Sequence, residues 1–116
     1  MSRVLVIDDD SMILRMAGFI LKKGGHEAVT AASGAEGLEI LKRELPDMVF
    51  VDNEMPDMNG MELLQAIGSD SSLSAVKVCL MTGTLTNEIQ AQAQALGASA
   101  CIGKPLNATE LLDAVG

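Results

Sequence analysis

Short, largely apolar runs alternate along this chain with segments in which apolar residues recur every three or four positions. A run of four to six residues, bounded by turn-forming residues, is typical of a strand, and a continuous apolar run indicates a strand buried on both faces. Five such strands are predicted, at residues 4–7, 27–32, 48–52, 76–81 and 99–102.

Each predicted strand is followed by a segment with the spacing of an amphipathic helix. The helices are predicted to begin near Ser11, Ser33, Asn59, Thr86 and Asn107. Ser33, Asn59 and Asn107 each have a glutamate three residues later, which is the spacing of a reciprocal capping box. The fourth helix, at 86–96, has a narrow apolar stripe, so we expect it to be weakly held.

Alternating strands and helices with short connections predict a doubly wound α/β fold with a parallel sheet and right-handed crossovers. The expected architecture is flavodoxin-like, with five strands in the order 2-1-3-4-5 and five helices. With 116 residues, the chain is predicted to form a single domain over 1–116. Strand order would reverse between the first and third strands, which is where ligands bind in open α/β sheets.

Carboxylates follow both strands that border this reversal. Asp8 and Asp9 end the first strand and Asp52 ends the third, so they are expected to face each other across the crevice. Three converging carboxylates repel each other and call for a cation. Because all the expected ligands are oxygens, Mg²⁺ is favoured over zinc.

Two further groups complete the predicted pocket. Thr82 brings a hydroxyl to the end of the fourth strand, and Lys104 brings an ammonium to the end of the fifth. Together with a metal ion they could surround a phosphoryl group, and phosphoryl transfer depends mainly on positioning and charge neutralisation. An aspartate can itself act as the nucleophile and form an aspartyl-phosphate.

Four motifs, in this order and spacing, carry a resemblance to a known family. They are Asp8-Asp9 after the first strand, Asp52 with Met55-Pro56 and Asn59-Gly60, Met81-Thr82-Gly83, and Gly103-Lys104-Pro105. Over essentially its whole length, the chain resembles a response-regulator receiver domain of two-component signalling.

The resemblance implies a role for each residue of the pocket. Asp52 would be the phosphoacceptor, with Thr82 and Lys104 binding the phosphoryl oxygens. Mg²⁺ would be held directly by Asp9 and Asp52, mostly through water by Asp8, and by the backbone carbonyl of Glu54. The resemblance also implies a cis Lys104-Pro105 bond, and that the Glu54 side chain projects beside the phosphoryl group.

The resemblance further implies partners and an output. A histidine kinase or phosphotransfer protein would donate the phosphoryl group, and the domain would catalyse only its own phosphorylation and dephosphorylation, so it is not expected to be an enzyme. The signal would pass from the face of the fourth helix, fifth strand and fifth helix to an output domain or effector protein. A chain ending at Gly116 would be either a stand-alone receiver or one separated from its output domain.

One position departs from the family pattern. The strand-five site where the family has a rotating aromatic ring is occupied by Cys101. We therefore expect a smaller rearrangement on phosphorylation, carried by the segment of the fourth helix.

Other classes of protein share parts of this pattern. Asp8 and Asp10 have the Asp-x-Asp spacing of haloacid-dehalogenase-like phosphatases, but Met12 is unusual there, the chain is short, and Asp52 would have no role. A flavodoxin-like electron carrier is disfavoured because the Thr82-Gly83-Thr84 loop follows the fourth strand rather than the first, and because the chain has no Trp or Tyr. A degenerate receiver that is not phosphorylated is disfavoured by the complete set of pocket residues.

Composition bears on nucleic-acid binding, on cellular location and on the role of the cysteines. Sixteen acidic and eight basic residues give a net charge of −8, which argues against direct nucleic-acid binding. No apolar stretch approaches the roughly 18 residues of a membrane span, and no signal peptide is evident, so a cytoplasmic protein is expected. Cys79 and Cys101 lack the spacing of a metal or redox motif and are interpreted as buried thiols.

Overall fold

The computed structural model describes residues 2–115 and contains one parallel sheet. Met1 and Gly116, the ends of the predicted 1–116 domain, lie outside the described residues. The strands are β1 (Arg3–Ile7), β2 (Glu27–Ala31), β3 (Met48–Asp52), β4 (Lys77–Thr82) and β5 (Ala100–Gly103). Their order is β2-β1-β3-β4-β5, and every neighbouring pair is parallel. The predicted doubly wound topology is confirmed.

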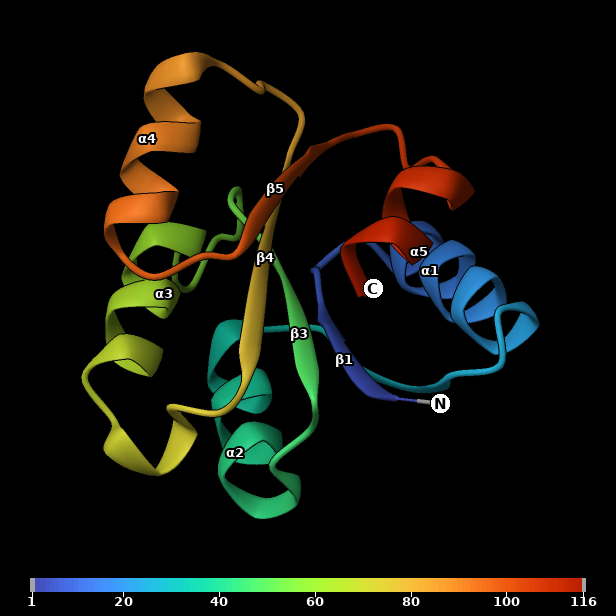
Figure 1. The fold of residues 1–116 in the computed structure, drawn as a ribbon, viewed down its shortest axis with the longest axis horizontal. Helices are drawn as coiled ribbons and strands as arrows, with labels where there is room; N and C mark the ends of the chain where they lie inside the picture. The colour runs from blue at the N-terminus through green and yellow to red at the C-terminus, as the bar shows by residue number, and fades with distance from the viewer. Residues whose placement is uncertain (1, 116) are drawn as a thin grey trace.

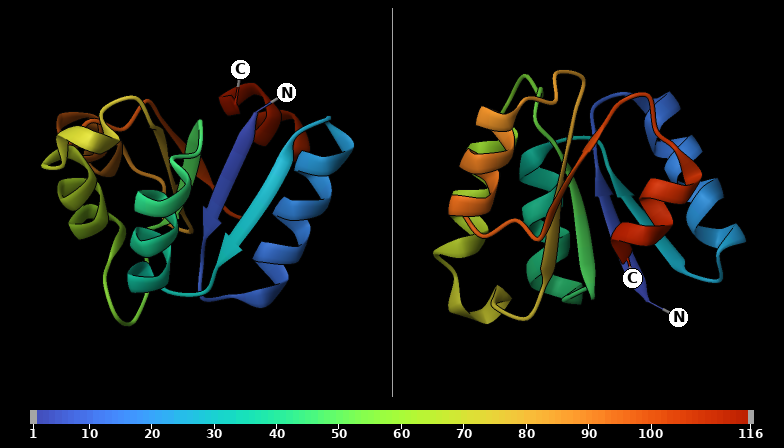
Figure 2. Two further views of the ribbon diagram at one scale, coloured as in Figure 1. Left: turned by 90° about the horizontal axis from the view of Figure 1, so that it is seen from below. Right: turned by 45° about the horizontal axis from the view of Figure 1, so that its top comes forward.

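Helices cover both faces of the sheet (Figure 1). They are α1 (Ser11–Lys23), α2 (Gly34–Glu44), α3 (Gly60–Gly68), α4 (Asn87–Ala95) and α5 (Ala108–Val115). α1 and α5 lie on one face, while α2, α3 and α4 lie on the other, as Figure 2 shows from two further directions. None of the helices within residues 2–115 is long and apolar enough to cross a membrane.

The central strand β3 joins two hydrophobic cores. Val49 and Val51 point into the core shared with α2, α3 and α4, whereas Met48 and Phe50 point into the core shared with α1 and α5. All five residues of β3 are buried. Alternate side chains of a strand point to opposite faces, so a strand covered on both sides needs apolar residues at every position. This is why its sequence forms a continuous run that ends in Asp52.

The predicted capping boxes are formed to different extents. Asn59 and Glu62 make both reciprocal bonds at the start of α3. Ser33 accepts a hydrogen bond from the Glu36 amide, and Asn107 accepts one from the Glu110 amide. The second bond of the box, in which the glutamate side chain accepts from the backbone amide of the capping residue, is found at neither of these two sites among the described residues. The spacing therefore located all three helix starts but predicted the full box correctly only at Asn59.

The polar loop predicted at 69–74 contains a short 3₁₀ helix, Ser71–Leu73. Asp70 caps it, since its side chain accepts a hydrogen bond from the Ser72 amide at 3.0 Å. Leu73 is buried in the hydrophobic core. Burial of this single apolar residue folds the loop against the sheet, which the polar pattern around it did not predict.

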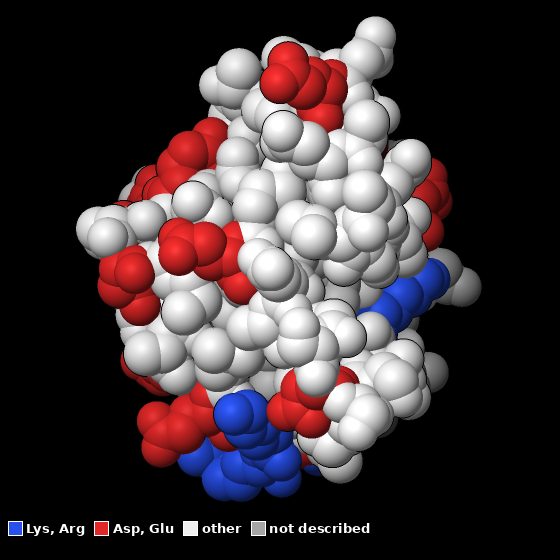
Figure 3. Space-filling model, turned by 90° about the vertical axis from the view of Figure 1, so that its left-hand side faces the viewer, with Lys and Arg blue, Asp and Glu red and all other residues white. Residues whose placement is uncertain are grey.

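Helix α4 is attached by few apolar side chains. Ala93 is its fully buried residue, and Ile89 is only partly buried. The face of the molecule over α3 and α4 is largely uncharged, with acidic groups scattered around it (Figure 3). Small buried side chains contribute little hydrophobic free energy, so α4 has a weak hold on the sheet, in agreement with its narrow stripe.

We predict that Gly60→Ala destabilises the fold and that Gly18→Ala does not. A Cβ at Gly60 would lie 2.6 Å from Leu80 Cδ1 and 2.8 Å from the Asn53 Cα, and such overpacking costs about 1–3 kcal/mol. A Cβ at Gly18 meets nothing within 4 Å, so alanine there gains about 0.5–1 kcal/mol from helix propensity. Urea unfolding of both variants measures the two effects; equal midpoints would contradict this packing of α3 on β3 and β4.

Candidate functional site

An acidic pocket lies where the order of the strands reverses. The register pairs Ile7 with Val51, so Asp8 just beyond β1 lies next to Asp52 at the end of β3. Each carboxylate of Asp8, Asp9 and Asp52 offers an oxygen, and these oxygens lie within 4.8 Å of one another. Asp8 and Asp52 are buried, while Asp9 is exposed at the rim. The structure thus brings together the three predicted carboxylates.

The ammonium of Lys104 is shared between the two buried carboxylates. Its Nζ lies 2.8 Å from Asp8 Oδ2 and 3.0 Å from Asp52 Oδ1. The backbone amide of Lys104 donates to the Thr82 carbonyl at 2.9 Å, which fixes the start of the side chain beside β4. One positive charge faces three negative ones, so the pocket keeps an excess of negative charge.

Burial and mutual contacts shift the pKa values of Asp8, Asp52 and Lys104. Removal from water raises the pKa of Asp8 and of Asp52 and outweighs the stabilising effect of the nearby Lys104 ammonium on each carboxylate. For Lys104, burial alone would lower the pKa, but the hydrogen bonds and charges of the two aspartates together raise it. The lysine therefore stays an ammonium, while the ionised carboxylates are held at a cost that a cation would reduce.

The donor atoms of the pocket suit a hard divalent cation. Asp8 Oδ2 is buried without a hydrogen bond of regular geometry, and its contact is the ion pair with Lys104. The group that could hold a metal consists of carboxylate oxygens alone, a donor set that favours Mg²⁺ over softer metals. These residues therefore fit the predicted ion.

Thr82 and the Glu54 side chain meet at the edge of the pocket. The Thr82 hydroxyl donates to Glu54 Oε1 at 2.9 Å, and the Gly83 amide donates to the same oxygen at 3.1 Å. The Thr84 amide in turn donates to Thr82 Oγ1 at 3.1 Å. The sequence placed this side chain beside the predicted phosphoryl site but gave no sign of these contacts, because they join two loops that are far apart in the chain.

Three further features belong to this edge of the sheet. The Lys104-Pro105 bond is cis, as expected. Asp10 is the N-cap of α1 and accepts a hydrogen bond from the Met12 amide. Asp57 accepts hydrogen bonds from the Gly34 and Ala35 amides and so holds the start of α2, a contact across 22 residues or more that the sequence did not reveal.

The two cysteines are free thiols away from the acidic pocket. Cys79 is fully buried, and burial raises the pKa of its thiol to about 12. Cys101 is half-buried on β5 opposite Leu80, and burial raises its thiol pKa as well. The interpretation as buried thiols is confirmed for Cys79 and holds in part for Cys101.

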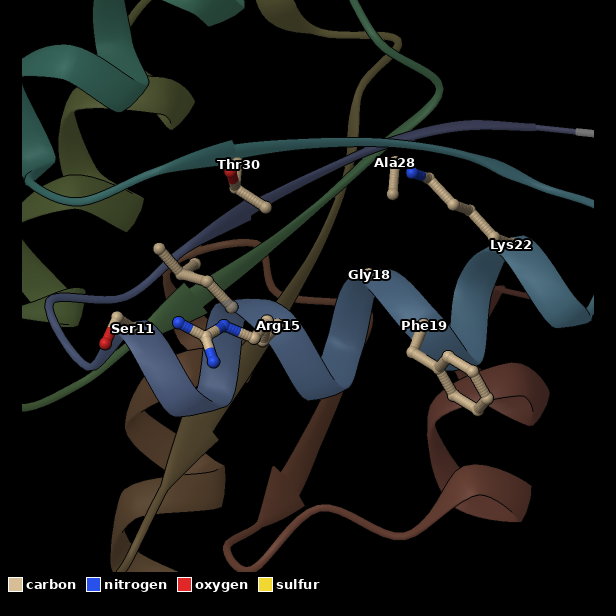
Figure 4. Close-up of a pocket in the computed structure, with 8 residues that line it drawn as sticks. Ser11, Arg15, Gly18, Phe19, Lys22, Ala28 and Thr30 are labelled. Carbon is tan, nitrogen blue, oxygen red and sulfur yellow. The ribbon is translucent and has the colours of Figure 1, made fainter.

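A separate hollow runs between α1 and β2 (Figure 4). Arg15, Phe19 and Lys22 are among the residues that border it. None of the three pocket carboxylates is among the residues that line this hollow. The acidic pocket is therefore a distinct feature at the carboxyl edge of the sheet.

A doubly wound parallel sheet with an acidic pocket, a hydroxyl and a shared lysine at its carboxyl edge defines a receiver-like α/β protein. The family model described as "Response regulator receiver domain" matches residues 4–116. This chain belongs to that family and is a receiver domain of two-component response regulators.

Individual relatives and structures agree with this assignment. The chain is 33% identical to the transcriptional regulatory protein GlrR of Escherichia coli over 98% of its own length but only 25% of that protein. It is 28% identical to the protein PilH of Pseudomonas aeruginosa, covering 99% of this chain and 95% of PilH. The structure of the chemotaxis protein CheY4 of Vibrio cholerae matches with a TM-score of 0.91 and 31% identity, over 97% of this chain and 94% of that one.

The family assignment decides between the interpretations of the sequence. The receiver interpretation is confirmed, and the phosphatase and degenerate-receiver alternatives find no support. Receiver domains are signalling domains that work with histidine kinases and phosphotransfer proteins, and they generally bind Mg²⁺ at an acidic aspartate cluster. The group formed by Asp8, Asp9 and Asp52 is such a cluster.

We predict that Asp52→Asn stabilises the metal-free fold. Because the pKa of Asp52 is raised in the folded state, its ionisation opposes folding at neutral pH, and Lys104 can still pair with Asp8. The free energy of unfolding should therefore increase in the presence of EDTA. Lowering the pH toward the folded-state pKa of Asp52 should also stabilise the parent chain, because the folded state then gains a proton on Asp52 more readily than the unfolded state does.

Urea unfolding with and without Mg²⁺ measures this effect, with the exposed Asp113→Asn as a control for the loss of one negative charge. Mg²⁺ should stabilise the parent chain more than Asp52→Asn, because a ligand stabilises the state that binds it better. A loss of stability in Asp52→Asn without metal would contradict the crowding of charge in this pocket.

Proposed function

We propose that Asp52 accepts a phosphoryl group from a histidine kinase or phosphotransfer protein. The observation that carries this proposal is the position of its carboxylate, which is buried at the carboxyl edge of the sheet 3.0 Å from Lys104 Nζ and beside the Asp8 and Asp9 carboxylates. In the transfer, an oxygen of Asp52 forms a bond to phosphorus as the bond to the donor histidine nitrogen breaks, and that nitrogen keeps the bonding electrons. The product is an acyl phosphate.

The other pocket residues would each have one task in this transfer. Asp8, Asp9, Asp52 and the Glu54 backbone carbonyl would hold Mg²⁺, with Asp8 acting mostly through water. When bound, Mg²⁺ supplies positive charge that offsets the carboxylates and the phosphoryl oxygens.

Two protein groups would bind the phosphoryl oxygens directly. Lys104 already lies between Asp8 and Asp52, so its ammonium can move to a phosphoryl oxygen with a small displacement. The Thr82 hydroxyl can donate to a second oxygen. Positioned charges of this kind account for most of the catalysis of phosphoryl transfer, and the domain would act only on itself rather than turn over a separate substrate.

The signal is proposed to leave through the face of α4, β5 and α5. Cys101 takes the place of an aromatic ring on β5 and lies half-buried against the core. Because the Cys101 thiol is much smaller than an aromatic ring, its movement would displace fewer neighbouring atoms. The conformational change on phosphorylation would therefore be carried mainly by the loop after β4 and by α4.

The receiver would act as one unit over residues 1–116 and pass its signal to an output domain or an effector protein. The chain spans a quarter of GlrR and nearly all of PilH. The matching region is thus part of a longer protein in one relative and nearly the whole protein in the other. The cytoplasmic location expected from the sequence stays a prediction.

We predict that incubation with acetyl phosphate and Mg²⁺ adds one phosphoryl group to the parent chain and none to Asp52→Asn. Intact-mass spectrometry measures the adduct, and omission of Mg²⁺ should abolish it. Asp57→Asn is the matched control, because Asp57 lies in the same loop but binds the start of α2. An adduct that survives Asp52→Asn but depends on Asp8 would instead point to phosphatase chemistry.

We predict that phosphorylation changes amide hydrogen exchange in residues 83–97. Helix α4 has a weak hold on the sheet, and the loop before it begins directly after Thr82, so this segment should respond more than the well-packed α2. Exchange mass spectrometry with and without acetyl phosphate measures the difference. Unchanged exchange throughout 83–97 at full occupancy of Asp52 would rule out this route for the signal.

A further inference from the structure

The Glu54 side chain occupies hydrogen-bond donors that the proposed phosphorylation would need. Its Oε1 accepts from the Thr82 hydroxyl at 2.9 Å and from the Gly83 amide at 3.1 Å. Thr82 is fully buried, whereas Glu54 and Gly83 are exposed. Within residues 2–115 the Glu54 carboxylate has no ion pair with a lysine or arginine, so these two donors are its main protein contacts.

The Thr82 hydroxyl cannot serve two acceptors at once. A hydroxyl carries a single proton and donates one hydrogen bond. Thr82 follows Met81, which pairs with Asp52 across the sheet, so Thr82 ends β4 next to the end of β3 that carries Asp52. In the proposed function its hydroxyl binds an oxygen of the phosphoryl group on Asp52. A phosphoryl oxygen would therefore compete with Glu54 for this proton, and the two anions would also repel each other.

We propose that the Glu54 side chain is an internal acceptor that holds Thr82 and Gly83 in the unphosphorylated arrangement and is displaced when Asp52 is phosphorylated. This inference rests on the proposed function of Asp52. Glu54 thus opposes phosphorylation and sets a threshold for the switch, because the hydrogen bond from Thr82 to Glu54 must break before the hydroxyl can turn to the phosphoryl group.

The same contacts connect the pocket to α4. Thr82 Oγ1 accepts a hydrogen bond from the Thr84 amide at 3.1 Å. Thr86, two residues further, is the N-cap of α4 and accepts from the Ile89 amide at 3.1 Å. A hydroxyl that turns from Glu54 toward Asp52 moves the acceptor of the Thr84 amide, and the start of α4 follows. This path needs no aromatic ring at Cys101.

The role of Glu54 can be separated from that of its backbone. The Glu54 amide donates to Asp52 Oδ1 at 3.2 Å, and a side-chain substitution leaves this bond in place. Glu54→Ala removes the acceptor, whereas Glu54→Gln keeps a carbonyl oxygen and removes the charge. Glu39→Gln, at an exposed position of α2, is the control for the loss of one negative charge.

Two measurements on the full chain test this inference. The first is the amide proton shift of Gly83 in the metal-free, unphosphorylated protein, which Glu54→Ala should move upfield because a hydrogen bond is lost. The second is the rate constant for phosphorylation by acetyl phosphate with Mg²⁺, followed by intact mass. Glu54→Ala should raise it about three- to tenfold, the effect of one or two lost hydrogen bonds.

Further variants give the expected order of effects. Glu54→Gln should fall between Glu54→Ala and the parent chain, and Glu39→Gln should match the parent chain. In a Thr82→Val background, Glu54→Ala should raise the rate constant by a smaller factor than it does when the hydroxyl is present, since the coupling between the two side chains is lost.

The experiments distinguish failure of the inference about Glu54 from failure of the proposed function of Asp52. An adduct on Asp52 whose rate constant changes less than twofold in Glu54→Ala, or a Gly83 amide that does not move in that variant, would overturn this inference and leave the proposed function standing. Absence of any Asp52-dependent adduct on the parent chain would overturn both.

Discussion

The crowding of charge around Lys104 is the constraint on which this structure depends. Two buried aspartates share one ammonium, with Nζ to oxygen distances of 2.8 and 3.0 Å, and a third carboxylate lies at the rim. Buried ion pairs of this kind contribute little net stability, because the loss of hydration offsets the attraction between the charges. The pocket therefore adds little to stability and keeps an excess of negative charge that a bound cation would offset.

The sheet and its two cores hold this unfavourable cluster in place. β3 is buried on both faces and delivers Asp52 to an edge where β1 delivers Asp8. The strand order then places β4 next to β3 and β5 next to β4, which brings Thr82 and Lys104 to the same edge. A few kcal/mol of charge repulsion can be tolerated because each of the many buried apolar side chains contributes about 1.5–3 kcal/mol.

The weakly packed side of the molecule lies next to the pocket. α4 contributes Ala93 as its buried residue, and the loop before it begins with the hydrogen bonds among Glu54, Thr82 and Thr84. A segment with few buried contacts is one that a small free-energy change can move. The hydrogen bonds at the edge of the pocket thus lie only a few residues before the start of α4.

The sequence by itself determined the alternation of strands and helices and the polar residues that end the strands. These follow from local signals: continuous apolar runs, capping spacings at Ser33, Asn59 and Asn107, and polar residues placed directly after strands. The strand order was an expectation from the flavodoxin-like architecture, which the structure confirms. The sequence also identified the departure at Cys101, because a single position of a known pattern can be compared directly.

Only the tertiary structure decided which polar groups contact each other between loops. The bonds from Thr82 and Gly83 to Glu54, those from the start of α2 to Asp57, and the burial of Leu73 depend on loop conformation. The sharing of Lys104 between Asp8 and Asp52 was also decided there. Side-chain contacts between segments 20 or more residues apart have no periodic signal in the sequence, because they arise only when the sheet has brought the loops to one edge.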